Sequence, residues 1–572
     1  MNRKLSRILA TALLATFVSA PAFAQKITSF TRLTDEARTY EKVEFDIDVN
    51  ADFTNPYDSK EVKMDMYITN PSGKRQILPC YWEGDRQWKA RYSPAETGEY
   101  SCYVQLKSRK GSSRSKSLHF TVSASDHDGF ITEVGPWTLN FDTGKKIRGI
   151  GENINRDPRP GKNPKYTYDY LLPKLAANGV NFIRTWLQSS TYPNEWRWNE
   201  SSKDFKGHKD QWSNNTLYRD PIQRLDQIVE LFEKYNVYNM MAIDAHGSFI
   251  AGSGWDSNPY NAINGGPCEK PGDFFTSPEA KARYKDRLRY LVARWGYSRS
   301  VAFWEFWNEV DNAQYQGTQV IRPTIPSRDI ADWHQEMATY LKSIDPYKHL
   351  VTTSVSHRLI EGIFDMKDMD LNQIHIYRNI DSIPKLIRTA TTLWEKPYVI
   401  GEFGFDWDWN NLDHSIGFFF DFDLRRGLWY GAFNQTPIYP MTWWWEFFDE
   451  RNMDWIYKSV STITNRMMAA GGATFEKVPV RTSIRGLESY AVKCGEEIYV
   501  YILNPLFERA YRFEIEVGGA DAADYRVEEY NIQRMQFRTL ETKNTINNHK
   551  ITFSPLTVMP WDDRVYILTP KK

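Results

Sequence analysis

Hydrophobic and polar residues alternate along the first part of the chain, from residue 27 to about residue 125. In the clearest run, residues 43–49, every second residue is apolar, and turn-forming segments such as Asn70-Pro71-Ser72-Gly73 separate the runs. Alternation predicts strands with one buried face, and short strands at this spacing predict a β-sandwich. We therefore expect a β-sandwich domain at residues 25–127.

The pattern changes after about residue 130, where short apolar runs alternate with amphipathic stretches of helical period. Repeated strand–helix units predict a parallel sheet, and eight of them predict a (β/α)8 barrel, the TIM barrel. We place this barrel at residues 128–472. The expected strands are 149–153, 181–186, 239–244, 301–307, 350–354, 373–377, 398–401 and 438–445.

The chain becomes rich in strands again after Gly472, as in 497–503 and 564–568. These runs predict a second β-sandwich at residues 473–572. The predicted fold class is therefore multidomain, with a central (β/α)8 TIM barrel flanked by two β-sandwich domains.

The charge and the aromatic content narrow the classes of partner. Lys plus Arg and Asp plus Glu both number 72, which leaves a formal net charge of zero. No Lys/Arg-rich run supplies local positive charge, so the sequence argues against a nucleic-acid partner. Aromatic residues make up 15% of the chain, more than a soluble core needs. Most should fill cores, and the remainder suit stacking against sugar rings.

Residues 1–24 have the pattern of a secretory signal peptide. Basic residues come first, an apolar stretch follows at 8–14, and the segment ends in Ala22-Phe23-Ala24. This arrangement predicts cleavage after Ala24. No later apolar run of about 18 residues could span a membrane. We expect a soluble monomer that is secreted or periplasmic.

The four cysteines do not suggest a metal site, because no metal-type Cys/His spacing is present. Cys80 and Cys102 fall in the same predicted β domain, where they could form a disulfide or stay as two thiols. The sequence leaves these alternatives open. Cys268 and Cys494 lie far apart in sequence and are expected to be free.

Two of the predicted strands carry carboxylates at their ends. Asn308-Glu309 ends the run 303–309, and Glu402 ends the core of the run 398–404. The carboxyl ends of barrel strands meet at one face, so both carboxylates should face one cleft. A pair of carboxylates in a cleft is the arrangement that hydrolyses glycosidic bonds.

Several motifs in a fixed order make this interpretation more specific. They are Trp304-Glu305-x-x-Asn308-Glu309, His375-x-Tyr377, Ile400-Gly401-Glu402-Phe403-Gly404 and Trp445-x-x-x-Asp449. Together they resemble the clan of retaining (β/α)8 glycoside hydrolases, closest in style to family 5, over about residues 140–460. Residues 92–100 resemble the late turn and strand of immunoglobulin-like domains that precede such barrels.

The resemblance implies roles for the strand-end residues. Glu309 would be the acid/base and Glu402 the nucleophile, and retention needs these carboxyl groups about 5–5.5 Å apart. A nucleophile must stay ionised, so Arg184 and the Tyr377 hydroxyl would donate to Glu402. Asn308 would donate to the sugar 2-hydroxyl.

Other expectations concern the surroundings of this pair. The acid needs a raised pKa, which Glu309 could gain from aromatic neighbours or from a negative Glu402. Glu305, deeper in the same strand, is expected to be a hydrogen-bonded interior carboxylate. Further substrate-binding candidates are His246 and His375, and a stacking platform at Trp445, with Trp443 as the second choice.

No cofactor or metal is implied. Residues 406–410 imitate the opening of a calcium loop, but the sixth position is Asn411 instead of glycine and the twelfth is Gly417 instead of glutamate. We expect a solvated loop beside the cleft, in which Trp407 or Trp409 lines an outer subsite.

The sequence thus predicts a secreted retaining glycoside hydrolase that cleaves a β-glycosidic bond of a polysaccharide or oligosaccharide by double displacement. The alternative is a non-catalytic carbohydrate-binding or adhesion protein on a glycosidase-like scaffold. A third interpretation makes the β-sandwiches the functional part, with Tyr81-Trp82 and Trp88 as a small glycan platform. The sugar and the choice between endo and exo action depend on the loops 188–217 and 248–273, and stay open.

Overall fold

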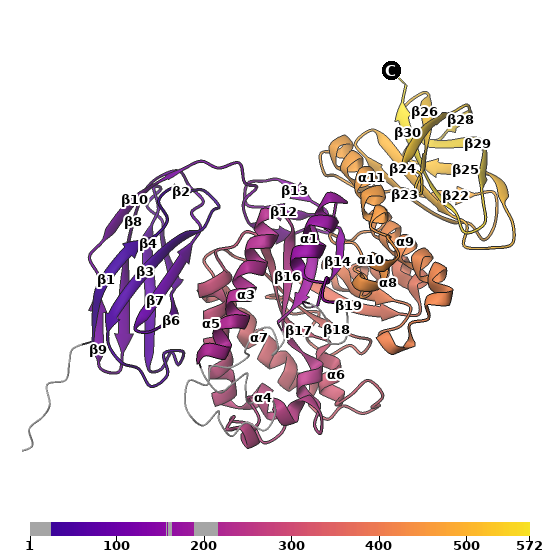
Figure 1. Ribbon diagram of the computed structural model, residues 1–572. Helices are drawn as coiled ribbons and strands as arrows, with labels where there is room; N and C mark the ends of the chain where they lie inside the picture. Colours follow the sequence, from indigo (N-terminus) through magenta and orange to yellow (C-terminus); the bar gives the residue numbers. More distant parts are fainter. Residues whose placement is uncertain (1–24, 156, 158–162, 188–214, 572) are drawn as a thin grey trace, which may run out of the picture.

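The structure is a computed structural model that describes residues 25–155, 157, 163–187 and 215–571, with side chains of 215–221 excluded. An N-terminal β-sandwich, a central barrel and a C-terminal β-sandwich follow one another along the chain (Figure 1). This confirms the predicted fold class. The predicted signal peptide and most of the loop 188–217 lie outside the described residues. Among the helices described, none is both long and apolar enough to cross a membrane.

The N-terminal domain consists of two sheets that face each other across an apolar core. Its strands alternate as predicted, with Val43, Phe45, Ile47 and Val49 all buried. One sheet has the order β1 (Lys26–Arg32), β3 (Val43–Asn50), β7 (Gln87–Tyr92) and β6 (Tyr81–Gly84). The other has the order β2 (Ala37–Arg38), β10 (Leu118–Ser123), β8 (Gly98–Ser108), β4 (Val62–Thr69) and β5 (Arg75–Pro79), with β9 (Gly111–Arg114) beside β8.

Two details of this domain answer questions that the sequence raised. The Tyr100 hydroxyl donates to the backbone carbonyl of Glu96 at 3.0 Å, which fixes the turn into β8. Cys80 and Cys102 are buried free thiols, as are Cys268 and Cys494, so the structure contains the two-thiol alternative. Burial raises the pKa of the Cys102 thiol to about 12.

Seven parallel strands form most of the barrel wall, each hydrogen-bonded to the next along the chain. Each strand is an apolar run because helices cover its outer side and packed side chains fill its inner side. The strands are β14 (Gly151–Asn153), β15 (Phe182–Trp186), β16 (Tyr238–Ala245), β17 (Val301–Asn308), β18 (Leu350–Val355), β19 (Leu371–Tyr377) and β20 (Tyr398–Gly404).

The eighth strand differs from the prediction. Residues 438–444 close the barrel through isolated bridges, with Ile438 beside Gly149 and Thr442 beside both Glu152 and Phe403. Pro440 has no N–H to donate to a ladder, which limits the regular pairing of this segment. Trp445 already begins helix α10 (Trp445–Glu450), so the predicted strand at 438–445 was too long.

Helices cover the outside of the barrel after most strands. The strand β18 is the exception, because residues 356–370 contain turns and no helix. The larger helices are α1 (Tyr168–Ala177), α3 (Asn215–Lys234), α5 (Pro278–Trp295), α7 (Ser327–Ile344), α8 (Ile383–Trp394), α9 (Gly417–Phe433) and α11 (Trp455–Gly471). Shorter ones are α4 (Asp273–Thr276), α6 (Val310–Tyr315), η2 (His246–Phe249), η3 (Gly254–Ser257), η4 (Ala262–Asn264), η5 (Ile380–Ser382), η6 (Trp409–Asn411) and η7 (His414–Ile416).

Helix α9 packs unusually close to the strand that carries Glu402. A Cβ atom added to Gly427 would lie 2.5 Å from the Phe403 ring, and one added to Gly431 would lie 2.7 Å from Pro440. Only glycine leaves room for this approach. The two glycines therefore let α9 support β20 and the closing segment from behind.

A small sheet closes the end of the barrel at which the parallel strands begin. It contains β11 (Ile131–Val134), β12 (Leu139–Phe141) and β13 (Lys146–Ile147), and its Leu139 and Phe141 join one apolar cluster with Phe182 and Phe303 of the barrel strands. Next to it, the buried Arg148 donates to the carbonyls of residues 431, 432, 434 and 436. Arg148 thus satisfies carbonyl groups at the end of α9.

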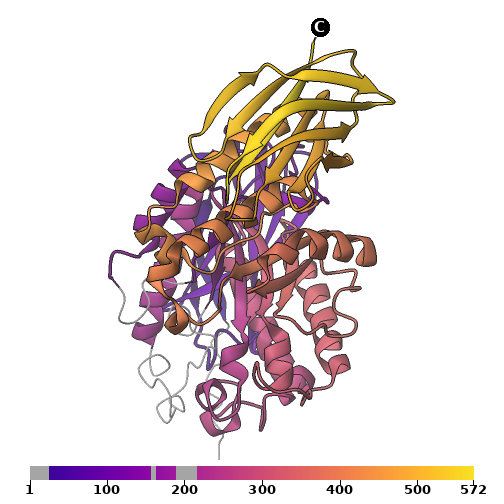
Figure 2. The ribbon, with the colours of Figure 1, turned by 90° about the vertical axis from the view of Figure 1, so that its right-hand side faces the viewer.

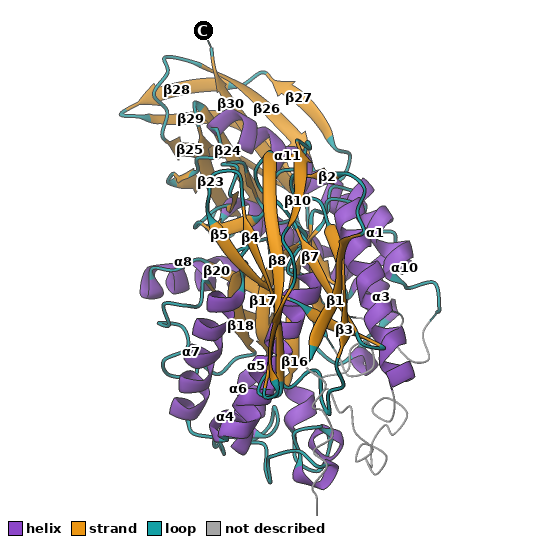
Figure 3. Cartoon of the chain, turned by 90° about the vertical axis from the view of Figure 1, so that its left-hand side faces the viewer, coloured by secondary structure: helices purple, strands orange, loops and turns teal. Residues whose placement is uncertain are grey.

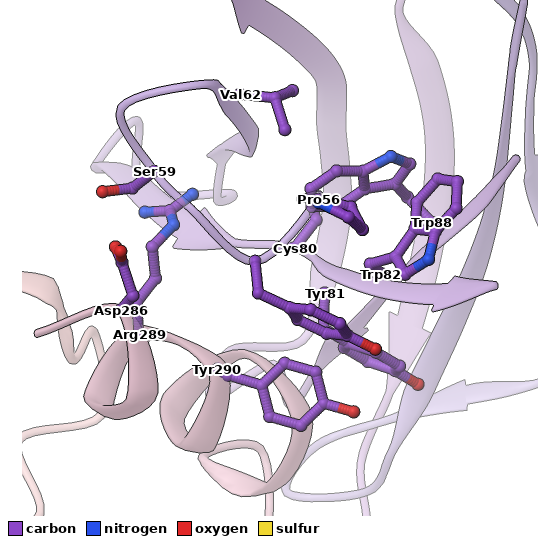
Figure 4. A pocket seen from close by; sticks show the side chains of 11 residues that line it. Pro56, Ser59, Val62, Cys80, Tyr81, Trp82, Trp88, Asp286, Arg289 and Tyr290 are labelled. Carbon is purple, nitrogen blue, oxygen red and sulfur yellow. The ribbon is translucent and has the colours of Figure 1, made fainter. Parts of the chain in front are cut away.

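The N-terminal domain lies against the barrel helix α5, with its strands in front of the helices in Figure 3. Part of the contact is aromatic. The rings of Tyr81 and Tyr290 have centroids 5.9 Å apart, next to a cleft of only about 20 Å³ (Figure 4). Tyr81, Trp82 and Trp88 are 1%, 7% and 4% exposed. These three residues are packed in the domain and its junction, so the glycan platform considered for them is wrong.

The C-terminal domain is a second antiparallel sandwich, and it packs on α11 and α9 (Figures 1 and 2). One sheet has the order β21 (Glu476–Lys477), β23 (Glu488–Cys494), β24 (Glu497–Leu503), β30 (Asp563–Pro570), β26 (Tyr525–Asn531) and β27 (Gln536–Leu540). The other has the order β22 (Val480–Thr482), β25 (Tyr511–Gly518), β29 (Lys550–Val558) and β28 (Lys543–Asn547).

Candidate active site

The two carboxylates found in the sequence meet at the carboxyl ends of the barrel strands. Glu402 lies in β20 and Glu309 directly follows β17, and their exposed fractions are 3% and 9%. His375 of β19 lies with them. One carboxylate oxygen from each glutamate and one ring nitrogen of His375 all lie within 4.8 Å of one another. The geometry thus brings together three groups that the sequence placed on three different strands.

Glu402 accepts hydrogen bonds from the two residues expected to orient it. Arg184 Nη1 donates to Oε1 at 2.7 Å, and the Tyr377 hydroxyl donates to Oε2 at 2.6 Å. These two bonds fix the orientation of the carboxylate. Burial, and next the charges of Glu402 and Glu309, hold the pKa of Tyr377 well above its usual value, so its hydroxyl stays a donor.

Arg184 is the centre of a buried polar network and is 0% exposed. It forms a two-pronged ion pair with Glu305 through bonds of 2.7 and 2.7 Å, as the interior role predicted for Glu305 requires. It also donates to Asn153 Oδ1 at 3.0 Å and to Asn308 Oδ1 at 2.7 Å. The sequence did not single out Asn153, whose only signal was its place at the end of the first strand.

The bond from Arg184 decides which way the Asn308 amide points. Because the amide oxygen faces Arg184, the NH₂ group faces the other side, where Nδ2 lies 3.4 Å from His246 Nδ1. Nδ1 of His246 is also 3.4 Å from Glu309 Oε2, and the His246 side chain is 25% exposed. This leaves the Asn308 NH₂ in a position to donate to a ligand between His246 and the carboxylates.

Glu309 is held in an unusual backbone conformation. Its φ of 56° lies in the left-handed region, and its N–H donates to Ser354 Oγ at 3.0 Å. A glutamate in this region costs of order 1–3 kcal/mol and persists where the surroundings enforce it. On the side chain, His375 Nδ1 lies 2.8 Å from Oε1 and Asn312 Nδ2 donates to Oε2 at 2.8 Å.

The electrostatic environment of Glu309 differs from the expectation. Burial alone would raise its pKa, but the hydrogen bond from His375 and the positive charges of His246, His375 and Arg184 outweigh burial and lower the pKa. The sequence argument considered aromatic neighbours and Glu402, and could not see these donors. The raised pKa predicted for Glu309 is therefore wrong for the protein without a ligand.

The tryptophans beside the site differ in exposure. Trp445, the platform preferred from the sequence, is 1% exposed, whereas Trp443, the second choice, is 9% exposed. The Trp443 ring centroid lies 4.9 Å from that of Trp186, and Trp445 packs against Trp409 at 5.1 Å. Exposure therefore favours Trp443 over Trp445 as a surface for a sugar.

The loop after β20 is held by Asp406. This carboxylate accepts from the N–H groups of Trp407 at 2.7 Å and Asp408 at 3.2 Å, and from Arg378 at 2.5 Å. Asp406, which stands at the first position of the calcium-loop imitation, is thus already hydrogen-bonded to protein donors. Trp407 is 52% exposed at this loop, whereas Trp409 packs on Trp444 at 4.6 Å.

The cluster of Glu309, His375 and Glu402 is compact enough to hold a cation. Arg184, however, already places a positive charge 2.7 Å from Glu402, and the Tyr377 hydroxyl fills the other oxygen. A second cation would meet repulsion from Arg184. The arrangement therefore fits two carboxylates used directly in acid–base and nucleophilic roles better than it fits a metal centre.

Comparisons with known proteins agree with the fold. The family profile of a domain of unknown function, DUF5060, matches residues 36–107. The mannan endo-1,4-beta-mannosidase A of Aspergillus aculeatus is 27% identical over 186 residues, which cover 32% of this chain and 44% of that protein. The mannan endo-1,4-beta-mannosidase 4 of Solanum lycopersicum is 25% identical over 237 residues, or 32% of this chain and 53% of that protein.

A solved structure matches the whole architecture. It is a proposed glycoside hydrolase from Bacteroides vulgatus, which is 14% identical, has a TM-score of 0.63, and covers 94% of this chain and 100% of that one. At this identity the match concerns the fold. The chain resembles the glycoside hydrolases of clan A and is distantly related to endo-β-1,4-mannanases. It spans about half the length of these two curated relatives.

Proposed function

We propose that this protein hydrolyses a β-glycosidic bond of a polysaccharide or oligosaccharide with retention of configuration. One observation carries the proposal: an oxygen of Glu309 and an oxygen of Glu402 lie within 4.8 Å. Retaining enzymes hold their carboxyl groups about 5–5.5 Å apart, whereas inverting enzymes need about 6.5–9.5 Å to fit a water molecule. The short distance between the nearest oxygens therefore favours the retaining arrangement.

Glu402 is the nucleophile in this proposal. It attacks the anomeric carbon, the bond to the leaving oxygen breaks, and a covalent glycosyl ester forms on Glu402. Arg184 and Tyr377 donate to the carboxylate and fix its direction of attack. Because Arg184 is also neutralised by Glu305, it orients Glu402 without holding it as tightly as an exclusive ion pair would.

Glu309 is the acid/base. In the first step it gives a proton to the leaving oxygen, and in the second it removes a proton from the water that attacks the ester. A sugar bound beside Glu309 displaces water from it, which raises the pKa of this carboxyl because burial disfavours its charged form. Esterification of Glu402 then removes a neighbouring negative charge, which favours the ionised, basic form of Glu309.

Substrate contacts follow from the groups left free to donate or stack. The Asn308 NH₂ donates to the sugar 2-hydroxyl, a bond that strengthens in the oxocarbenium-like transition state. His246 lines the subsite beside it, His375 holds Glu309, and Trp443 stacks on a sugar face. The proposed localisation is secreted or periplasmic, supported by the signal-peptide pattern of residues 1–24.

The substrate we test first is β-1,4-mannan, because the curated relatives act on mannan by their names. Purified protein is incubated with mannans, β-glucans, xylans and aryl β-glycosides, with Glu402→Ala as the matched inactive control. Release of oligosaccharides by the wild type alone supports the proposal, and the lengths of the products separate endo from exo action. Glycan binding by both proteins without product release would support the non-catalytic carbohydrate-binding alternative and contradict the hydrolase.

A further inference from the structure

A buried amide lies directly behind the proposed acid/base. Asn312 follows Glu309 by three residues, one turn along α6, and is 0% exposed. Its Nδ2 donates to Glu309 Oε2 at 2.8 Å. Its Oδ1 accepts from Arg358 Nη2 and lies 3.5 Å from Ser356 Oγ. Both ends of the amide are therefore engaged.

Arg358 is itself held in place from several sides. It follows β18 in the segment that has no helix, and it donates to the carbonyls of Gly317 at 3.2 Å and Val320 at 3.0 Å. Its guanidinium lies 4.1 Å from the centroid of the Tyr315 ring, and it pairs with Asp311 at 3.3 Å. These contacts hold Arg358 in position independently of Asn312.

Asp311 fixes the same segment to α6. It is 0% exposed and accepts from the Ser356 N–H at 2.7 Å, the Ser356 hydroxyl at 2.6 Å and the Arg358 N–H at 3.2 Å. A carboxylate with several donors forms a rigid joint, because each bond restrains the others. The segment after β18 and the helix after β17 therefore act as one support for Asn312.

This support decides the direction of the Asn312 amide. A guanidinium has only donors, so the oxygen end of the amide must face Arg358 and the NH₂ end must face Glu309. The NH₂ group can then only donate to Glu309, which favours the ionised carboxylate. Oε1 of Glu309 already lies 2.8 Å from His375 Nδ1, whereas Oε2 lies 3.4 Å from His246 Nδ1. The longer contact on the His246 side of Oε2 is where a sugar oxygen has access.

We propose that Asn312, locked by Arg358, is a positioning residue that fixes the carboxylate of Glu309 and favours its ionised form. The inference rests on the proposed function and deepens it, because the ionised form is the base of the second step. Among the described residues, the other charged or titratable groups facing Glu309 are His375 and Tyr377 from β19, His246 from η2, Glu402 from β20 and Arg184 from β15. Asn312 adds a neutral donor on the side of α6.

The test is the pH profile of kcat/KM for Asn312→Ala and Asn312→Asp on the best substrate of the wild type. Loss of the donor in Asn312→Ala should move the alkaline limb, on which Glu309 loses its proton, upward by about half a unit to one unit. Asn312→Asp should move it further, because the new negative charge also opposes ionisation. Asn372→Ala is the matched control, since Asn372 is a barrel asparagine of 2% exposure that donates to the Phe364 carbonyl.

A second pair of variants tests the lock without touching Asn312. Arg358→Met frees the amide to turn its oxygen toward Glu309, and should also raise the limb. Arg358→Lys keeps a donor and should stay nearer to the wild type. If Asn312→Ala, Asn312→Asp and Arg358→Met reduce turnover but leave the alkaline limb of the pH profile unchanged, the cluster has only a structural role and the inference is overturned. A wild type that hydrolyses no glycoside would instead refute the proposed function itself.

Discussion

At the scale of single residues, the site depends on how a few buried charges share donors. Arg184 serves two carboxylates, giving two bonds to Glu305 and one to Glu402. Burial opposes its charge, but the attraction of Glu305 and then Glu402 outweighs burial and raises the pKa of Arg184, so it stays a cation. The Arg184–Glu305 ion pair holds Arg184 in place, and Arg184 in turn positions Glu402 for the reaction.

The role of Glu309 can be separated from that of Glu402 by the leaving group. Glu309→Ala should slow hydrolysis of the natural glycoside by about 10²–10⁴-fold, because its leaving oxygen needs a proton. With a dinitrophenyl leaving group, which needs none, the rate of ester formation should change little. Pre-steady-state release of dinitrophenol measures that rate. Equal losses of this step on both substrate types would remove the acid role of Glu309.

The strand-end rule explains how much of the site the sequence could predict. Glu309, Glu402, Arg184, His375 and Tyr377 belong to the carboxyl-terminal parts of strands in one barrel, so topology alone brings them to the same face. The contribution of Asn312 could not be predicted, because it depends on where a short helix turns its side chains. The lowered pKa of Glu309 could not be predicted from the sequence either, because it results from side-chain hydrogen bonds and charges that depend on the folded structure.

At the scale of elements, the prediction succeeded where an apolar run is a regular strand and failed where it is not. The runs that became β15 to β20 are buried on both faces, which makes them easy to recognise in the sequence. Residues 438–444 are as apolar, but Pro440 interrupts the ladder and only bridges form. A hydrophobic pattern reports burial, whereas a strand also needs backbone donors in register.

The loop that follows the nucleophile strand carries a prediction about chain length. Trp407 is 52% exposed on a loop that Asp406 holds rigid, so it can stack on a sugar at low entropic cost. Trp407→Ala should raise KM for long oligosaccharides about 5–10-fold, the equivalent of about 1 kcal/mol, and leave kcat unchanged.

Two controls belong to the Trp407 experiment. An aryl monosaccharide should be hydrolysed as fast by Trp407→Ala as by the wild type, because it does not reach an outer subsite. Phe507→Ala removes another exposed aromatic, 70% exposed in the C-terminal domain, and should leave both substrates unaffected. An unchanged KM for long oligosaccharides in Trp407→Ala would rule out the outer subsite at this position.

At the scale of the whole molecule, charged groups fasten the N-terminal domain to the barrel. Asp226 of α3 accepts from Arg91 of the N-terminal domain at 2.8 Å and from Arg294 of α5 at 2.7 Å. Burial alone would raise the pKa of Asp226, but the bonds and charges of the two arginines lower it to about 2. A carboxyl whose pKa falls on folding stabilises the folded state above its unfolded pKa of about 3.9.

We predict that Asp226→Ala destabilises the protein by about 3 kcal/mol, because it leaves Arg91 and Arg294 with less compensation in a buried place. The N-terminal domain should become protease-sensitive below the main unfolding temperature. In the wild type this contribution should be complete above about pH 4 and be lost as the pH falls toward 2. Calorimetry and limited proteolysis from pH 7 to pH 2 measure both effects.

Asp169→Ala is the control for the Asp226 experiment. Its partner is Arg224, and its side chain is 59% exposed, so removal of this surface pair should cost less than about 1 kcal/mol. Equal stability of the Asp226 and Asp169 variants would show that the junction does not depend on the buried charges.

The central claim is that Glu402 is the nucleophile of a retaining reaction, and rescue by azide tests it most directly. Glu402→Ala should have lost turnover of an activated aryl β-glycoside. Added azide can occupy the space of the missing carboxylate and attack the anomeric carbon from the same side, which gives an α-glycosyl azide. NMR of the product should show that anomer. A β-glycosyl azide from Glu402→Ala would contradict the account, because it would assign the acid/base role to Glu402.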